Sequence, residues 1–464
     1  MKNLSDIKKI SWVICGLAFG VILSYLLILY MKWVEIAGFD IPQDDLIGDY
    51  FVGVLWASVL GMSILLWPVS KQDKTGLMWA WLAKIIVTLG FLLIYEYTYN
   101  DDQWSYFSIP RSPNYHYFEY SLGWPIRGGD NESAYQPVGT RNIDHFVIWH
   151  NLIFPSDSYH AVKISFSMVG LIAIYLFYRA GMLFMEKKGN LPFFYVLALI
   201  PTDLVWSSTL GKEPIVLLGI GLYVYGVVAW RKKGQIFPLI ISLAGVILAG
   251  SIRNWLYPIL LFPLSIFLVV GRVHLIARII FIGLMIYIAA YAMDQVQYKY
   301  RISDSQGYIE QLSKINQETA HGKSSGGGSS QEHRTFSTFT ELLLFLPFGF
   351  FTALFRPLPG DVFSSFGFLA SFEGVLFLWL FLRAWKRSSL RDLKNPLIFW
   401  GVLVVLSWTS VYAFVAYQNL GTAMRWRLQI LPLFLGLMLY LGRDRTKTMS
   451  TPVTEHDIPP SQIK

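Results

Sequence analysis

The side chains best suited to chemistry at a membrane surface lie in the stretch 200–214, which joins two apolar runs. Lys212 and Glu213 follow the hydroxyl residues Ser207 and Ser208, and a glycine and a proline beside them are typical of a tight turn into a helix. Charge at the edge of an apolar run is costly to desolvate, so it usually serves a purpose. Two interpretations are open: a cation and a carboxylate that act on a ligand, or a Lys–Glu pair that neutralises itself and caps a helix.

Cations suited to binding phosphate occur in several short turns between apolar runs. A guanidinium offers two parallel donors to adjacent phosphate oxygens. Cations predicted to lie outside the cell are exceptions to the usual cytoplasmic bias and need a reason. The predicted phosphate-binding set is Lys212, Arg253, Arg356, Arg425 and Arg427. The alternative is that each extends separately toward lipid headgroups.

Carboxylates near these turns are candidates for a general base, which sugar transfer needs to remove a proton from an acceptor hydroxyl. Asp101 and Asp102 follow the third apolar run, and Trp104 and Tyr106 after them offer rings on which a sugar can stack. For any single aspartate, a solvated acidic loop is the plainer alternative.

A rival acidic pair, Asp44 and Asp45, follows the first apolar run. The histidines match no zinc motif, so no metal site is predicted, and dependence on a divalent cation is left open. The single cysteine, Cys15, excludes an internal disulfide.

The elements that must position these groups are apolar helices. Of the 464 residues, 54% are hydrophobic and 15% are charged, and the apolar residues fall in repeated runs close to the length that crosses a bilayer. The chain is therefore predicted to be all-α, a polytopic transmembrane helical bundle. Its net charge of +8 comes from basic clusters beside the runs, which indicates membrane orientation rather than nucleic-acid binding.

These clusters predict about twelve spans, with both termini in the cytoplasm and one bundle over residues 1–445. External segments are expected at 98–159 and 294–362, a helix in the interface near 143–154, and a disordered cytoplasmic tail at 446–464. The predicted spans are 10–31, 51–70, 76–97, 161–185, 191–206, 215–230, 236–251, 255–271, 279–293, 362–385, 396–417 and 428–441.

The apolar segment 336–355 does not fit this alternation, so it is predicted to re-enter the membrane or to lie at the outer interface. Four charged residues within or beside the apolar runs, Lys84, Lys163, Asp203 and Glu373, are predicted to make polar contacts inside the bundle.

The chain resembles multi-span proteins of bacterial surface-polysaccharide gene clusters. The resemblance rests on Pro201, Trp206-Ser-Ser and Gly211-Lys-Glu, and it extends from about Asp101 to Leu441. Supporting positions are Phe355-Arg-Pro-Leu-Pro, Glu373 and Arg425-Trp-Arg with Pro432. The broader kinship is with the GT-C class of membrane glycosyltransferases, in which an external acidic motif near the first spans supplies the catalytic carboxylate. An Asp-Glu pair after the first span is missing here, so Asp44–Asp45 or Asp101–Asp102 would stand in.

The resemblance implies a multi-pass enzyme of the bacterial inner membrane that acts in O-antigen or exopolysaccharide assembly. It would transfer a sugar from a polyprenyl-phosphate-linked donor to a glycan acceptor on the outer face, in contact with membrane lipid and without a cofactor. Two alternatives remain: an O-antigen-type polymerase that joins polyprenyl-diphosphate-linked repeat units, and a transporter or flippase of lipid-linked glycan.

Overall fold

The computed structural model describes residues 18–33, 45–98, 102–111, 138–153, 157–270, 338–362 and 365–444, together with isolated positions elsewhere. Over these residues the chain forms helices and turns, with no strand among them. Most of the predicted span 279–293, most of 294–337, the tail 446–464 and the candidates Asp44 and Asp101 lie outside the described residues.

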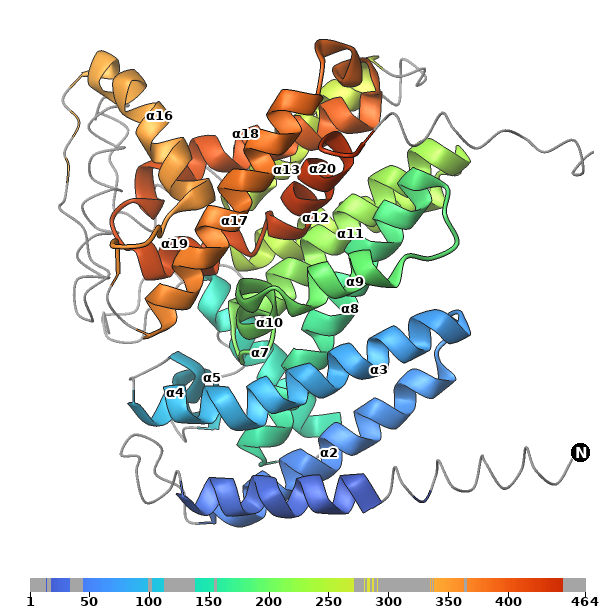
Figure 1. The fold of residues 1–464 in the computed structure, drawn as a ribbon, viewed down its shortest axis with the longest axis vertical. Coiled ribbons are helices and arrows are strands. Elements are labelled where there is room, and N and C mark those ends of the chain that lie inside the picture. The colour runs from blue at the N-terminus through green and yellow to red at the C-terminus, as the bar shows by residue number, and fades with distance from the viewer. Residues whose placement is uncertain are drawn as a thin grey trace, which may run out of the picture.

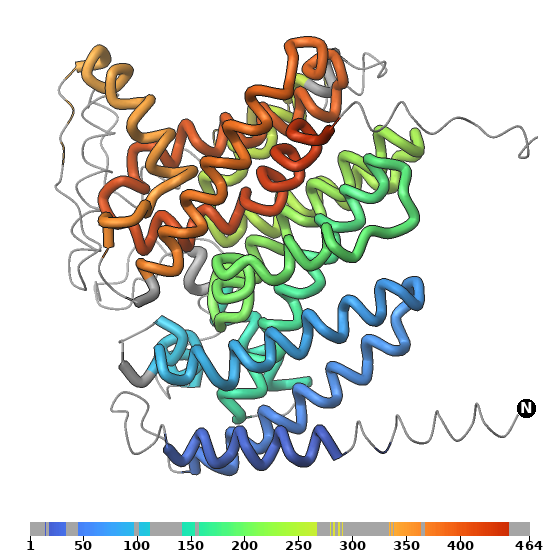
Figure 2. The backbone as a smooth tube through the Cα atoms, viewed as in Figure 1, coloured from blue at the N-terminus to red at the C-terminus, as the bar shows by residue number. Residues whose placement is uncertain are grey.

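Among the described residues, six helices are long and apolar enough to cross a membrane, and they form the main body of the bundle (Figures 1 and 2). The second begins as α3 (Lys71–Ile86) and continues through the π-helical η1 (Val87–Phe91) into α4 (Leu92–Thr98). The other five are α2 (Leu46–Leu66), α8 (Tyr159–Met185), α11 (Lys212–Lys233), α17 (Ser365–Arg387) and α18 (Pro396–Ala416). The predicted class, a helical bundle of a multi-span membrane protein, is supported at this level.

Shorter helices complete the structure. Four apolar ones accompany the helix 18–33: α12 (Phe237–Ile252), α13 (Leu256–Val270), α16 (Phe339–Phe355) and α20 (Leu431–Leu441). The others are α5 (Asp102–Ser108), η2 (Ile109–Arg111), α7 (Val138–Ile153), α9 (Leu191–Leu199), α10 (Pro201–Trp206), η4 (Leu390–Lys394) and α19 (Leu420–Arg427).

Two predicted spans are interrupted or short. The segment 191–206 is divided into α9 and α10 at Ile200, because Pro201 starts a new helix and has no N–H to continue the old one. The last predicted span contains only the 11-residue α20, about 17 Å at 1.5 Å per residue. The hydrocarbon core of a bilayer is about 30 Å thick, so α20 alone does not reach across it.

Helix α8 lies at the centre, with α2 and α3 against one side and α11 against the other, while α12 packs on α11 (Figure 1). The α11–α12 approach depends on glycines: a Cβ on Gly245 would lie 2.4 Å from the carbonyl oxygen of Gly219. Small residues of this kind allow helix backbones to pack closely where burial of apolar surface provides little driving force.

Helix α16 covers one end of α18. Phe345 packs edge-on against Tyr417, with ring centroids 4.8 Å apart, and a Cβ on Gly349 would touch Ala413. Away from this contact, α16 diverges from α18 (Figure 1). The predicted interfacial helix near 143–154 corresponds to α7, which packs against α5 and α12.

Candidate functional site

Charged residues from separate turns of the chain meet at Glu213, the second residue of α11. Its carboxylate, 1% exposed, accepts a hydrogen bond of 2.8 Å from Arg253 Nη2 at the end of α12. It also accepts two bonds from Arg425 on α19, 2.6 Å from Nε and 2.9 Å from Nη2. Three distant segments of the chain are thus joined by one buried carboxylate, and the bidentate geometry with Arg425 is the strongest form of such a pair.

Arg425 extends this group toward the surface. Its Nη1 lies 3.7 Å from the carboxylate of Asp102, which is 67% exposed. Gln103, the next residue of α5, accepts a hydrogen bond of 2.8 Å from the backbone N–H of Leu210. This bond fixes α5 to the turn before Glu213, so Asp102 is held beside the arginine rather than on a separate loop.

Aromatic rings line the same region. Lys212 Nζ lies 5.9 Å from the ring centroid of Tyr106, and the Arg425 guanidinium lies 5.4 Å from the ring of Trp206. The guanidinium carbon of Arg253 lies 5.9 Å from the ring centroids of both Trp255 and Trp426. Burial raises the pKa of the Tyr106 hydroxyl above its ordinary value, so this phenol is protonated at neutral pH.

Arg253 retains a donor in this group. Its side chain is 8% exposed, and its Nε is buried without a hydrogen-bond partner among the described residues. A buried, unused N–H donor is energetically unfavourable unless an acceptor occupies the position in front of it. We call Asp102, Lys212, Glu213, Arg253 and Arg425 the Glu213 cluster; three cations and two carboxylates give it a net positive charge.

Two of the five predicted phosphate-binding residues have other partners. Arg356 forms a bidentate pair with Asp361 in its own loop, 2.8 Å from Nη2 and 2.9 Å from Nε. The hydrogen bonds from Arg356 lower the pKa of Asp361. Arg427 is fully buried and donates to the carbonyl oxygens of Leu354 and Arg356, at 2.9 and 3.1 Å. Arg427 therefore holds the loop after α16 in place.

The other predicted site residues lie outside the Glu213 cluster or contact it only through aromatic packing and local hydrogen bonds. Asp45 caps the N-terminus of α2, where its side chain accepts a hydrogen bond of 2.9 Å from Gly48 N. Trp104 packs against Phe107 and Tyr159. Of the two predicted carboxylates that the structure describes, Asp102 lies beside Arg425, whereas Asp45 caps a helix.

Ser207 and Ser208 bind the buried ammonium of Lys84. Lys84 Nζ donates to the carbonyl oxygen and the Oγ of Ser207, at 2.9 and 2.6 Å, and to Ser208 Oγ at 3.0 Å. The polar contacts predicted for Lys84 and Glu373 are present: Glu373 on α17 accepts from Thr202 N at 2.7 Å and from the Thr202 hydroxyl. These bonds fix the α9–α10 break and the turn leading to Glu213.

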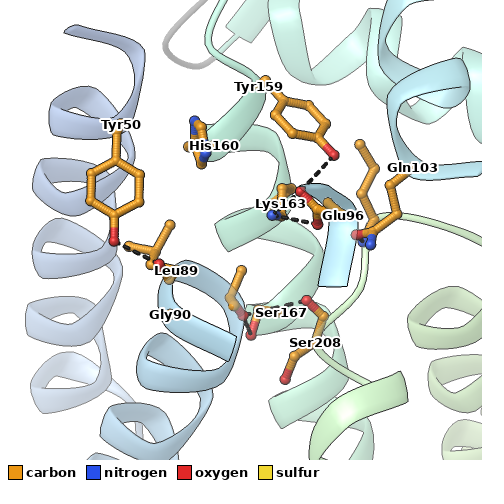
Figure 3. Close-up of polar contacts among 12 residues, drawn as sticks. Tyr50, Leu89, Gly90, Glu96, Gln103, Tyr159, His160, Lys163, Ser167 and Ser208 are labelled. Carbon is orange, nitrogen blue, oxygen red and sulfur yellow. Dashed lines mark hydrogen bonds and ion pairs between the residues drawn. The ribbon is translucent and has the colours of Figure 1, made fainter. Parts of the chain in front are cut away.

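A buried ion pair joins α4 to α8. Glu96 accepts hydrogen bonds from Tyr159 at 3.1 Å and from Lys163 at 2.8 Å (Figure 3). The sequence marked Lys163 as an intramembrane cation but not its partner, 67 residues away. The one available signal is that Glu96 ends an apolar run, where a carboxylate needs a neutralising partner.

The described residues offer no metal site, and comparison with known proteins gives no role for the Glu213 cluster. Among the described residues, no group of three or more histidine, cysteine, aspartate or glutamate side chains is placed to hold a metal ion. Comparison of the chain with protein-family models, curated proteins and solved structures finds no match. Any function must therefore be inferred from the Glu213 cluster itself.

Proposed function

We propose that the chain is a membrane glycosyltransferase of surface-polysaccharide assembly, acting at the outer face on a sugar carried by a polyprenyl phosphate. The observation that carries this proposal is the convergence of Arg253, Arg425 and Lys212 beside Asp102, with the Nε donor of Arg253 unused. Cations that meet at the end of a membrane helix suit a phosphate whose lipid tail remains in the bilayer.

In this proposal each charged group has one role. The acceptor hydroxyl oxygen attacks the anomeric carbon of the donor sugar while the bond from that carbon to the phosphate oxygen breaks. Asp102, the exposed carboxylate of the cluster, takes the hydroxyl proton. The lipid phosphate leaves with the bonding electrons, and Arg253, Arg425 and Lys212 stabilise its negative charge.

Glu213 positions the arginines in this scheme. A carboxylate that is 1% exposed and bound by two guanidiniums is unsuited to taking a proton from a substrate. It instead fixes the direction of both guanidiniums before substrate binds, which lowers the cost of reorganisation during the reaction. Replacing Arg425 by lysine would keep the charge but lose the two-point attachment.

A polymerase joining lipid-diphosphate-linked repeat units is the second candidate, because two arginines meet at Glu213. A diphosphate carries more negative charge than a monophosphate and needs more cationic donors. This candidate makes the arginines more important to the rate than any one carboxylate.

The test uses full-length variants in cells that depend on this chain for surface glycan, with lipid-linked intermediates extracted in parallel. Asp102→Asn is expected to reduce transfer by about 10²–10⁴-fold, the usual contribution of a general base. Stalled lipid-linked intermediates should accumulate as a result. Asp45→Asn is the matched control, because it makes the same chemical change at a helix N-cap, where asparagine is equally suitable.

The outcomes separate the candidates. If Asp102→Asn transfers glycan like the wild type while Arg425→Lys does not, Asp102 is not the base. That result would favour polymerisation. Normal glycan assembly by both variants would contradict a catalytic role for the cluster. Lipid-linked glycan retained on the cytoplasmic side would instead indicate transport.

A further inference from the structure

An apolar cavity lies far from the Glu213 cluster along the same helices. It is formed between α8 and α9 on one side and α18 and α20 on the other, and Val224 and Val228 of α11 reach it. Since α11 begins at Lys212 and these valines lie in its second half, the cavity is at the opposite end of α11 from Glu213. It encloses about 450 Å³, within the roughly 300–1,000 Å³ of small-molecule sites.

The cavity wall is apolar and its rim is cationic. Phe177, Phe193, Trp400 and Leu437 are among the wall residues, and Lys187 and Arg443 lie at the rim with Asn190. Such a combination of an apolar interior and a basic rim between membrane helices matches the chemistry of a lipid chain with an anionic headgroup.

The carboxylates near this rim are neutralised by other cations. Glu186, next to Lys187 in the chain, forms an ion pair of 2.7 Å with Lys232. Asp444, next to Arg443, lies 3.9 Å from Arg387. The Lys187 side chain is exposed and makes no hydrogen bond or ion pair with a described residue. The rim therefore presents uncompensated positive charge.

We infer that this cavity binds a glycerophospholipid with an anionic headgroup, from the leaflet in which α8 and α11 end. One acyl chain occupies the apolar interior, and the phosphate contacts Lys187 and Arg443. A zwitterionic lipid offers the same chain but carries a cation that the rim repels, so the site prefers an anionic headgroup. This inference is independent of the proposed glycosyl transfer.

Gly436 on α20 provides a direct test of the interior. A Cβ built on it meets only the Phe193 ring, at 3.8 Å, which is ordinary van der Waals contact. Gly436→Ala should therefore be neutral, whereas the longer side chain of Gly436→Leu extends into the cavity and occupies the volume of the acyl chain. Val196, a partly exposed wall residue on α9, gives a second blocking variant, Val196→Phe.

The experiment measures lipid retention by native mass spectrometry on the full chain in detergent, with phosphatidylglycerol and phosphatidylcholine as probes. The wild-type chain is expected to retain one phosphatidylglycerol in preference to phosphatidylcholine. Gly436→Leu and Val196→Phe should reduce retention at least tenfold, and Gly436→Ala should not.

Headgroup recognition is tested by Lys187→Gln, with the adjacent exposed residue Lys188→Gln as matched control, because Lys188 does not line the cavity. Removing one cation near a headgroup should weaken phosphatidylglycerol binding about fivefold and leave phosphatidylcholine unchanged. The inference is overturned by equal binding of the two lipids. It is also overturned by wild-type retention in both blocking variants, or by equal effects of Lys187→Gln and Lys188→Gln.

Discussion

Replacing Glu213 by glutamine removes the charge that holds Arg253 and Arg425 together at the end of α11. Glutamine has nearly the same shape, so packing is retained and the variant isolates the electrostatic contribution. Two guanidiniums then remain in a group that has lost its buried carboxylate. The expected result is a large decrease in the free energy of unfolding, even though no apolar contact is removed.

The magnitude follows from burial. Glu213 is 1% exposed and Arg253 8% exposed, and removing one partner of such a buried pair costs about 3–5 kcal/mol. Arg425 is 23% exposed and keeps Asp102 at 3.7 Å. Loss of its pair with Glu213 should therefore cost about as much as loss of a surface ion pair, about 0–1 kcal/mol. We therefore expect a total near 3–5 kcal/mol, most of it from Arg253.

The measurement is equilibrium unfolding of the purified full chain in mixed detergent micelles. Asp102→Asn is the control, because an exposed carboxylate should change the free energy of unfolding by no more than about 1 kcal/mol. The double variant Glu213→Gln/Arg253→Met should lose less than the sum of the single variants, by about 0.5–3 kcal/mol for residues in direct contact.

One result would refute the reasoning. If Glu213→Gln unfolds like the wild type and the double variant is additive, the carboxylate does not hold the two arginines in the folded chain. The Glu213 cluster would then have no structural centre.

Two further predictions concern the elements around the cluster. Gly170→Ala on α8 would place a Cβ 1.9 Å from the carbonyl oxygen of Ser207. The turn before Glu213 must then shift, which lowers the free energy of unfolding by about 1–3 kcal/mol. Gly436→Ala, with its open surroundings, is the control, and equal melting temperatures of the two variants would contradict the close approach at Gly170. In the loop after α16, hydrogen bonds from Arg356 lower the pKa of Asp361. The ionised pair therefore stabilises the fold fully at pH values above the unfolded-state pKa of about 3.9. This stabilisation is lost as the pH falls through the lower folded-state pKa. The melting-temperature difference between wild type and Asp361→Asn should therefore be present at pH 7 and shrink below about pH 4; a difference that does not vary with pH would exclude the ionised pair as its cause.

Much of the helical framework can be predicted from the sequence, because an apolar run determines a helix locally. Predicted spans 161–185 and 396–417 agree with α8 and α18 to within two residues at each end. Pro201 also signals the break between α9 and α10, since proline cannot donate the hydrogen bond that would continue the helix. The predicted span 191–206 was nevertheless wrong as a single helix, because it runs across Pro201 and contains two short helices.

The choice of ionic partners could not be predicted in the same way. All five predicted cations were candidates on equal terms, yet Arg425 reaches Glu213 across 212 positions while Arg356 pairs with Asp361 five positions away. Asp361 is an acidic neighbour of Arg356 in the sequence, whereas no aspartate or glutamate lies within ten positions of Arg425. The partner of Arg425 depends on where α19 packs, which is a property of the whole bundle.

By itself, the sequence determined which segments are apolar helices and which turns carry charge, because hydrophobic length and helix-breaking residues act over a few neighbouring positions. Only the tertiary structure decided that Asp102, Glu213, Arg253 and Arg425 form one group, that Asp45 is a helix cap, and that Arg427 is buried. The physical reason is that a buried charge is stabilised by whichever opposite charge the packing of distant helices brings within hydrogen-bond reach.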